Sequence, residues 1–243
     1  MRDEKSRLES VSRWYSSEYG SSFFARLFFY RFRSLQPHFV GSTCLELGPA
    51  DGQMTRRLLE VFQNVTSVEG SPSFCDKLRI DLGEFPGFRV DCALFEEYKS
   101  DHVFDTVVAS HVMEHIKDPV CILKKIKEWV SPKGVLLLLV PNAFSFHRLV
   151  AVKMGLLERP DQLNDLDIRL GHRRVYTKAR LVNHLESAGW EISLTGGVFF
   201  KALSNQQIEQ WFTEQMLDGF YELGQDFPEY AAEIYAVCRL PRS

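Results

Sequence analysis

The feature that most constrains this chain is an alternation of short apolar runs with helical patterns that begins near residue 43. The apolar runs are continuous rather than alternating, as expected for strands covered on both faces. Strands are predicted at residues 43–47, 65–69, 88–91, 104–109 and 135–140, with helices at 53–62, 73–82 and 119–130. Repeated strand–helix–strand units predict a parallel sheet with helices on both sides. Pro132-Lys133-Gly134 is predicted to break the chain before the fifth strand.

The segments on either side of this core extend the α/β pattern. We expect residues 1–40 to form a helical cap, because aromatic and aliphatic residues recur there at three- and four-residue steps. The cap would either pack on the main domain, 41–243, or act as a mobile lid together with Tyr15 and Tyr19. Residues 141–176 break the rhythm and are interpreted as an insertion above the sheet.

After the insertion the alternation resumes. A helix is predicted at 177–188, ending at Gly189, where a C-terminal glycine is expected. Two last strands are predicted at 190–198 and 234–240, with an amphipathic helix at 206–220 between them.

Composition excludes several classes of protein. A net charge of −3 over 243 residues provides no strong field for nucleic acid. The first residues carry both charge signs, so we expect no signal peptide. The longest aliphatic run, 135–140, is far shorter than a membrane span. Five scattered cysteines without C-x-x-C spacing indicate free thiols, which favours the cytoplasm.

A glycine turn lies where the first strand meets the first helix. Gly48 and Gly52 allow a ligand to approach the backbone closely, because neither carries a Cβ. Glu46 and Asp51 would repel a phosphate but suit a ligand that carries positive charge. Glu69 closes the second strand, a position from which a carboxylate can accept hydrogen bonds from ribose hydroxyls. The turn and the acid together predict a cationic nucleoside ligand.

Three segments resemble the class I S-adenosylmethionine-dependent methyltransferases. They are the glycine turn at 45–52, the fourth strand and following turn at 104–119, and the fifth-strand region at 129–142. The glycine turn departs from the family pattern at Ala50, which stands where the middle glycine is expected. The resemblance implies a Rossmann-like, doubly wound, seven-stranded and mostly parallel sheet. It also implies S-adenosylmethionine as the cofactor.

The resemblance also implies roles for the residues around the glycine turn. Glu46 and Gly48 would contact the methionine portion of the cofactor. Asp51 and Gly52 would form the turn beneath it, and Glu69 would hold the ribose hydroxyls.

Residues after the third and fourth strands would complete this cofactor site. Ala93 and Leu94 would line the adenine pocket. Phe95 is interpreted as a core residue in preference to a wall of that pocket. Ser110 would border the methionine end, although it would equally suit the cap of the next turn.

A competing motif lies within the same stretch. His111 to His115 match H-x-x-E-H, in which two histidines on one helical face bind zinc. The preceding residues are predicted to be a buried strand, and Pro119 ends the turn that follows. A long helix is therefore not expected here, and no metal site is predicted.

Methyl transfer needs a base where the acceptor must lose a proton. The candidates are His111, Glu114, His115 and His172, and we favour His172 over His111. His172 lies in a segment, 171–177, that resembles one found in small-molecule members of the family. A purely structural hydrogen bond from His172 to the next helix is an equal alternative.

Three arginines beside this segment leave two interpretations open. They would pair with an acidic group of the acceptor, or form a solvated face beside nearby aspartates. The three are Arg169, Arg173 and Arg174.

The function predicted from the sequence is O- or N-methylation of a small metabolite, such as a sugar or natural-product intermediate. The alternatives are a nucleotide-binding oxidoreductase and a methyltransferase-like protein that binds a partner without catalysis. No nucleic-acid partner is expected, and a homodimer is considered.

Overall fold

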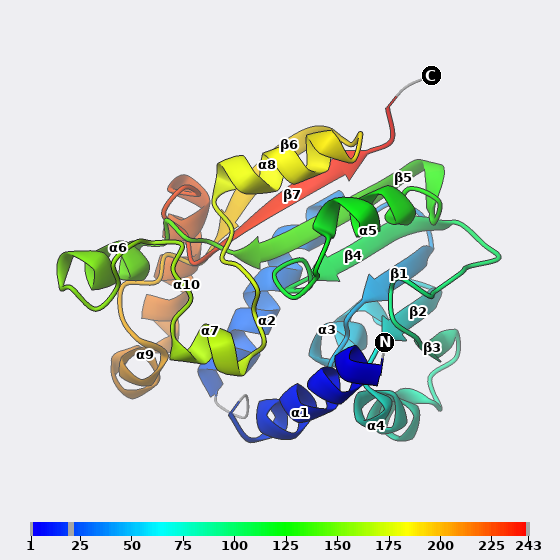
Figure 1. Ribbon diagram of the computed structural model, residues 1–243, viewed down its shortest axis with the longest axis horizontal. Helices are drawn as coiled ribbons and strands as arrows, with labels where there is room; N and C mark the ends of the chain where they lie inside the picture. Colours follow the sequence, from blue (N-terminus) through cyan, green and yellow to red (C-terminus); the bar gives the residue numbers. More distant parts are fainter. Residues whose placement is uncertain (1, 19–21, 242–243) are drawn as a thin grey trace.

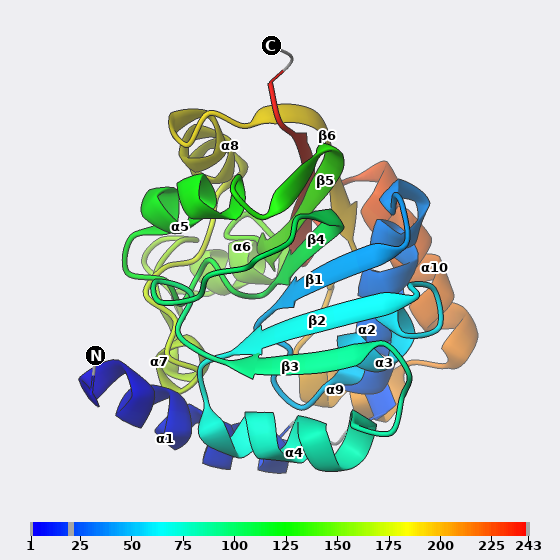
Figure 2. The same cartoon turned by 90° about the vertical axis from the view of Figure 1, so that its right-hand side faces the viewer.

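The computed structural model describes the backbone of residues 2–18 and 22–241, and the side chains of 4–12 and 23–241. Seven strands form one sheet in the order β3-β2-β1-β4-β5-β7-β6, with β1 to β5 parallel and β7 antiparallel to β5 and β6. This arrangement, visible in Figure 2, confirms the predicted mostly parallel, doubly wound fold. The strands are β1 Thr43–Leu47, β2 Asn64–Glu69, β3 Phe88–Cys92, β4 Phe104–Ser110, β5 Val130–Pro141, β6 Glu191–Val198 and β7 Glu233–Arg239.

Helices cover both faces of the sheet, as Figure 1 shows. Apolar side chains of α2, α3, α9 and α10 form a core with one face, and those of α5 and α8 form a core with the other. The helices are α1 Arg2–Glu18, α2 Ser22–Leu35, α3 Gln53–Leu58, α4 Pro72–Leu82, α5 Pro119–Ile126, α6 Phe146–Lys153, α7 Asp165–Arg169, α8 Lys178–Ser187, α9 Asn205–Trp211 and α10 Glu214–Asp226, with a 3-10 turn η1 at Gln36–His38.

The N-terminal segment contributes two different helices. The aromatic helix α2 is part of the core, with Leu27 and Leu35 among its buried side chains. Helix α1 lies beside α4 and α7 in both ribbon views (Figures 1 and 2). The predicted lid residues Tyr15 and Tyr19 lie outside the part of the chain whose side chains are described.

Two local predictions were wrong. Pro132 does not break the chain before the fifth strand, because β5 already begins at Val130, so the predicted helix at 119–130 ends early, at Ile126. Instead, the pairing of β4 with β5 shifts register across this stretch, which leaves Pro132 and Lys133 exposed. A proline is tolerated in a strand at such an irregularity.

The predicted helix at 206–220 is two helices. Phe212 adopts an extended conformation, and the Thr213 side chain accepts a hydrogen bond from the backbone N–H of Met216. Threonine is a favourable N-cap residue, so the chain starts a new helix there.

The prediction of free cysteines is confirmed. All five cysteines are free thiols, three buried and two exposed. In the part of the chain that is described, no helix has the length and apolar character needed to cross a membrane.

Candidate active site

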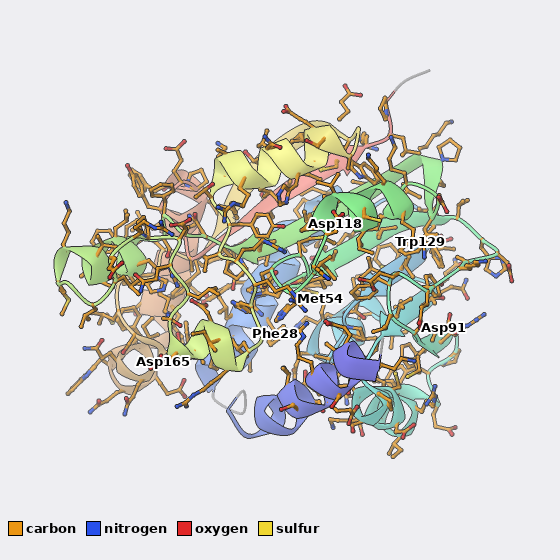
Figure 3. All side chains as sticks on the ribbon, viewed as in Figure 1. Phe28, Met54, Asp91, Asp118, Trp129 and Asp165 are labelled. Carbon is orange, nitrogen blue, oxygen red and sulfur yellow. The ribbon has the colours of Figure 1, made fainter. Side chains whose placement is uncertain are left out.

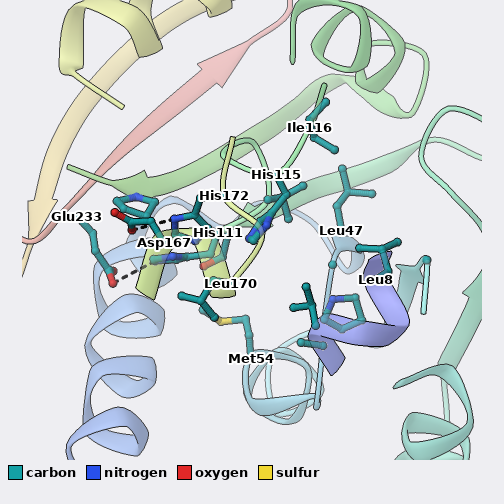
Figure 4. Close-up of a pocket in the computed structure, with 18 of the residues that line it drawn as sticks. Leu8, Leu47, Met54, His111, His115, Ile116, Asp167, Leu170, His172 and Glu233 are labelled. Carbon is teal, nitrogen blue, oxygen red and sulfur yellow. Dashed lines mark hydrogen bonds and ion pairs between the residues drawn. The ribbon is translucent and has the colours of Figure 1, made fainter. Parts of the chain in front are cut away.

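A large cavity of about 900 Å³ lies at the edge of the sheet where the parallel strands end. Its walls come from α1, α2, the loops after β1 to β5, the 141–176 segment and the loop after β6. Figure 3 labels two of its lining residues, Phe28 of α2 and Met54 of α3. In Figure 4, Leu8 and Leu47 lie on one side of the cavity and Glu233 and Asp167 on the other. The cavity therefore has an end beside the glycine turn and an opposite, more polar end.

The glycine turn forms the first end. Gly48 has a φ of +67°, and a Cβ there would lie 2.9 Å from Val112, so no side chain fits. Ala50 has a φ of +50°, a left-handed conformation that an alanine adopts at a cost. Gly52 does not line the cavity. A Cβ on it would meet Leu78 of α4 at 2.8 Å, so its glycine is required by helix packing.

Glu46 is a buried carboxyl in the wall beside the turn. Its Oε2 accepts hydrogen bonds from the hydroxyls of Thr55, at 2.7 Å, and Ser67, at 2.8 Å. Burial raises the pKa of Glu46 to about 7, with Glu69 adding to the rise, although both hydroxyls oppose it. A buried acid with a raised pKa gains strongly from a cationic ligand, which stabilises its ionised form.

Glu69 ends β2 in the same wall. Its carboxylate accepts hydrogen bonds from the backbone N–H groups of Ser71, at 2.8 Å, and Ala50, at 3.2 Å. Burial raises the pKa of Glu69, and these backbone donors oppose the shift. The two donors hold the carboxylate at the cavity surface and leave further acceptor sites on its oxygens.

The other predicted cofactor residues divide into two groups. Ala93, Leu94 and Ser110 line the cavity. Phe95, interpreted from the sequence as core, both packs against the core and lines the cavity. Asp51 is not among the lining residues. Its Oδ1 is buried and has no hydrogen-bond partner among the described residues.

His111 lies between two carboxylates. It follows β4 with a φ of +58°, and its Nδ1 lies 3.2 Å from Glu114 and its Nε2 3.0 Å from Glu233. Burial and Arg31 oppose protonation, but the two carboxylates raise the pKa of His111 overall. A histidine held in this way favours its charged form and is a poor proton acceptor.

His172 has a different environment at the polar end. Its Nδ1 is 3.1 Å from Asp167 of α7, a contact drawn in Figure 4, and Asp167 also pairs with Arg148. The predicted hydrogen bond from His172 to helix 177–188 is therefore replaced by one to α7. With the Nδ1 proton donated to the carboxylate, Nε2 keeps its lone pair. This histidine–aspartate pair has the arrangement of an oriented general base.

Several residues of the polar end were not found from the sequence. They are His147 and Arg148 of α6, Lys201 after β6, Glu233 at the start of β7 and Asp167. None belongs to a motif. The sequence shows only that charged residues occur in segments interpreted as an insertion or a strand. It does not show which of their side chains lie close together in the fold.

The three predicted arginines behave differently from one another. Arg173 donates to the carbonyl of His115 and pairs with Glu4, and Arg174 donates to the carbonyls of Met113 and Ile116. These two arginines tie residues 173 and 174 to the loop after β4, a contact that neither interpretation drawn from the sequence included. Arg169, at the end of α7, is exposed.

The two histidines of the competing zinc motif do not share one face of a helix. His111 to His115 lie in turns rather than on a helix, and the two histidines face different partners. A different set, Glu114, His115 and His172, brings one ligand atom from each residue within 4.8 Å of the others. Such residues suit a divalent metal, but here Glu114 lies against His111. The absence of a metal stays a prediction.

Comparisons with known proteins support the interpretation of the glycine turn. The sequence model of a methyltransferase domain family matches residues 19–194, well over half of the chain. A comparison with curated proteins finds no match.

Solved structures share the fold at low sequence identity. The complex of DhpI with SAM and HEP is 15% identical, with a TM-score of 0.63 over 98% of this chain and 96% of that one. The glycopeptide N-methyltransferase MtfA with S-adenosylmethionine is 15% identical, with a TM-score of 0.59 over 88% and 94%. The N-methyltransferase NodS from Bradyrhizobium japonicum, with S-adenosylhomocysteine, is 14% identical, with a TM-score of 0.58 over 92% and 90%.

The family match covers the glycine turn, the strand-end acids and the predicted base. It excludes the oxidoreductase alternative, for which the turn already lacked the required glycine pattern. The chain belongs to the family of S-adenosylmethionine-dependent methyltransferases.

Proposed function

We propose that this enzyme methylates an oxygen or nitrogen atom of a small acceptor, such as a sugar or a natural-product intermediate. The observation that carries the proposal is a cavity of about 900 Å³ with two chemically different ends. That volume lies near the top of the range for small-molecule sites. It suits a cofactor at the glycine turn together with an acceptor at the polar end.

The residues at the glycine turn fit S-adenosylmethionine. This cofactor supplies a methyl group on a sulfonium, which leaves readily. In our proposal the Glu46 carboxylate pairs with the ammonium of the cofactor, and Gly48 permits its close approach. Glu69 accepts hydrogen bonds from the ribose hydroxyls, and Ala93 and Leu94 contact the adenine.

The remaining predicted residues have lesser parts in this proposal. Ser110 borders the reacting centre, since it lines the cavity at the end of β4. Asp51 and Gly52 shape the turn from behind and do not contact the cofactor.

His172 is the proposed general base. Asp167 orients its ring, so that Nε2 can accept the proton of an acceptor hydroxyl as the oxygen attacks the methyl group. His111 is assigned a positioning role, because both of its nitrogens face carboxylates. A hydroxyl must lose its proton as it attacks, whereas a neutral amine attacks through its lone pair, so the proposed base favours a hydroxyl acceptor.

Helix α1 is proposed as the lid over the cofactor end. Leu8 and Arg7 line the cavity, and Glu9 accepts hydrogen bonds from Ser71 and Ser73 at the start of α4. Among the described residues of α1, the hydrogen bonds and ion pairs to the rest of the protein are polar contacts at its surface. They suit a helix that opens to admit ligands and closes to exclude water.

The test is a search for the methylated product. Extract from cells that lack this protein is incubated with the enzyme and S-adenosylmethionine, and mass spectrometry follows compounds that gain one CH₂. We expect a product that appears together with S-adenosylhomocysteine, and that is lost with His172→Ala but kept with the matched control His102→Ala. Methylation confined to proteins or nucleic acids in the extract would contradict the proposal.

A further inference from the structure

The polar end of the cavity holds two arginines whose charges are already neutralised. Arg31 pairs with Glu233, with its Nε 3.0 Å from both carboxylate oxygens, and both side chains are buried. Arg148 lies 3.1 Å from Asp167 and also donates to the carbonyls of Pro160 and Gln162. Neither guanidinium carries an uncompensated charge that a ligand would have to balance.

Lys201 lines the same end and is not neutralised in this way. Within the described part of the chain, its ammonium forms no hydrogen bond and no ion pair within 4.0 Å, although it lies in the field of Glu233, Asp167 and Arg148. Burial lowers the pKa of Lys201 to about 8, and Arg148 adds to the fall, while Glu233 and Asp167 oppose it. Lys201 is half-buried, so its ammonium is partly removed from water without a partner to compensate for the lost hydration.

The backbone that carries Lys201 is held firmly. Phe199 has a φ of +60°, and Phe200 donates its N–H to the carbonyl of Phe220. Gly224 of α10 packs so closely on Phe199 that a Cβ on it would lie 2.5 Å from that backbone. The position of the lysine at the cavity wall therefore follows from packing between β6 and α10.

His147 adds a second group without a partner. It lines the cavity, and its Nδ1 is buried with no hydrogen-bond partner among the described residues. Burial lowers the pKa of His147 to about 2, and Lys201 and Arg148 lower it further. A neutral imidazole can still donate one hydrogen bond to a ligand.

The charges at this end sum to an excess of one positive charge. Arg31 with Glu233 and Arg148 with Asp167 cancel, as does His111 with Glu114, which leaves Lys201. A ligand with a negatively charged group would balance this excess positive charge.

We propose that the polar end of the cavity is an anion-binding subsite, in which Lys201 and His147 hold a phosphate, phosphonate or carboxylate group of the acceptor. The inference rests on the proposed function, since it names the chemical class of the molecule that is methylated. Lysine recognises such groups as a point charge. Its ammonium would fix the acidic end of the acceptor while the atom to be methylated lies nearer His172.

The test measures anion binding to the full-length protein saturated with S-adenosylhomocysteine. Inorganic phosphate and acetate are titrated separately by calorimetry, at constant ionic strength set with chloride, against the parent and Lys201→Met. We expect at least one anion to bind the parent, and its affinity to fall about tenfold or more in Lys201→Met. The stronger of the two anions identifies the acceptor group as phosphate-like or carboxylate.

Three controls make the result specific. Lys201→Arg retains the positive charge and should retain the affinity for the anion. Lys178→Met, at the exposed start of α8, should leave anion affinity unchanged. Affinity for S-adenosylmethionine should stay within about twofold in every variant, which also reports that each is folded. Anion affinity should also fall as the pH rises through about 8, because Lys201 loses its charge.

Two results would overturn the inference. One is a parent that binds neither anion, and the other is a Lys201→Met protein that binds an anion as tightly as the parent. If S-adenosylmethionine still binds in either case, the anion subsite fails while the proposed function stands. A product search that yields only uncharged methylated compounds would likewise reject the subsite alone.

Discussion

The two ends of the cavity are built in different ways. The cofactor end comes from consecutive strand–helix units, so Glu46, Gly48 and Glu69 lie within 24 residues of one another in the sequence. The polar end brings together Arg31, His147, Lys201 and Glu233, which come from four distant segments. The difference teaches that one end is a property of the fold, whereas the other is a property of this particular chain.

Removing the proposed base distinguishes the functions of the two ends most clearly. His172→Ala should lower the turnover number by about 10² to 10⁴-fold, the usual contribution of a general base. The affinity for S-adenosylmethionine should not change, because His172 lies at the polar end. Steady-state kinetics and calorimetry check this, with the exposed His102→Ala as control. Equal loss of turnover and of cofactor affinity would show that the ends are not separate.

A reciprocal change removes the proposed ribose acceptor. Glu69→Ala should weaken S-adenosylmethionine by about 10- to 100-fold, since hydrogen bonds to a charged group are lost. Calorimetric titration measures the effect, and Glu84→Ala, at an exposed acid in the turn after α4, serves as the matched control. An unchanged dissociation constant would remove Glu69 from the cofactor site.

The pH dependence of cofactor binding reports on Glu46. The free protein holds a proton on this carboxyl up to about pH 7, whereas binding of an ammonium requires its ionised form. Affinity should therefore be constant above pH 7 and fall by about tenfold per pH unit below it. Glu46→Gln should abolish this slope. A pH-independent affinity in the parent would show that Glu46 does not pair with the cofactor.

The same pKa shift affects stability with the opposite sign. Because the folded pKa of Glu46 lies above the ordinary value of 4.5, its contribution to the stability of the unliganded protein is fully present below about pH 4.5. That contribution is lost as the pH rises through about 7. As the pH rises through about 7, the affinity for the cofactor should therefore increase while the stability of the unliganded protein decreases.

Much of the fold could be predicted from the sequence because its signals are local. Continuous apolar strands and the glycine turn identified the parallel half, and Thr177 and Gly189 delimited a helix that the structure also has. Predictions failed where one residue changes the local geometry. Pro132 is accommodated by a register shift, and Thr213 starts a new helix within an otherwise continuous amphipathic pattern.

The site could be predicted only where it belongs to the fold. Six of the eight cofactor residues expected from the sequence line the cavity, because they lie at the ends of strands or just beyond them. Lys201 and Glu233 were missed, since a lysine after one strand and a glutamate opening another are ordinary there. The partner of His172 was also missed, because the turn of chain that brings Asp167 beside it depends on the packing of α7.

A smaller effect is expected at the position where the turn departs from the family pattern. Ala50→Gly should stabilise the protein by about 0.5–1 kcal/mol, because a left-handed φ of +50° strains alanine more than glycine. Thermal unfolding measures the change, and Ala188→Gly, at the ordinary φ of a helix end, should not stabilise. Destabilisation by Ala50→Gly would mean that the methyl group makes a contact that outweighs the strain.

The smallest effect is expected from metal removal. Dialysis against a chelator should leave turnover unchanged, and elemental analysis should find no stoichiometric metal. The reason is that His172 is already paired with Asp167, and Glu114 with His111. Loss of activity that returns on adding one divalent metal would reassign Glu114, His115 and His172 as ligands.

The central claim is that the carboxylate-rimmed glycine turn selects a cationic nucleoside over a diphosphate. Calorimetric titration of the unmodified protein with S-adenosylmethionine and, separately, with NADH tests it directly. The account predicts one S-adenosylmethionine bound per chain and no heat of binding with NADH. Binding of NADH, or no binding of S-adenosylmethionine, would contradict it.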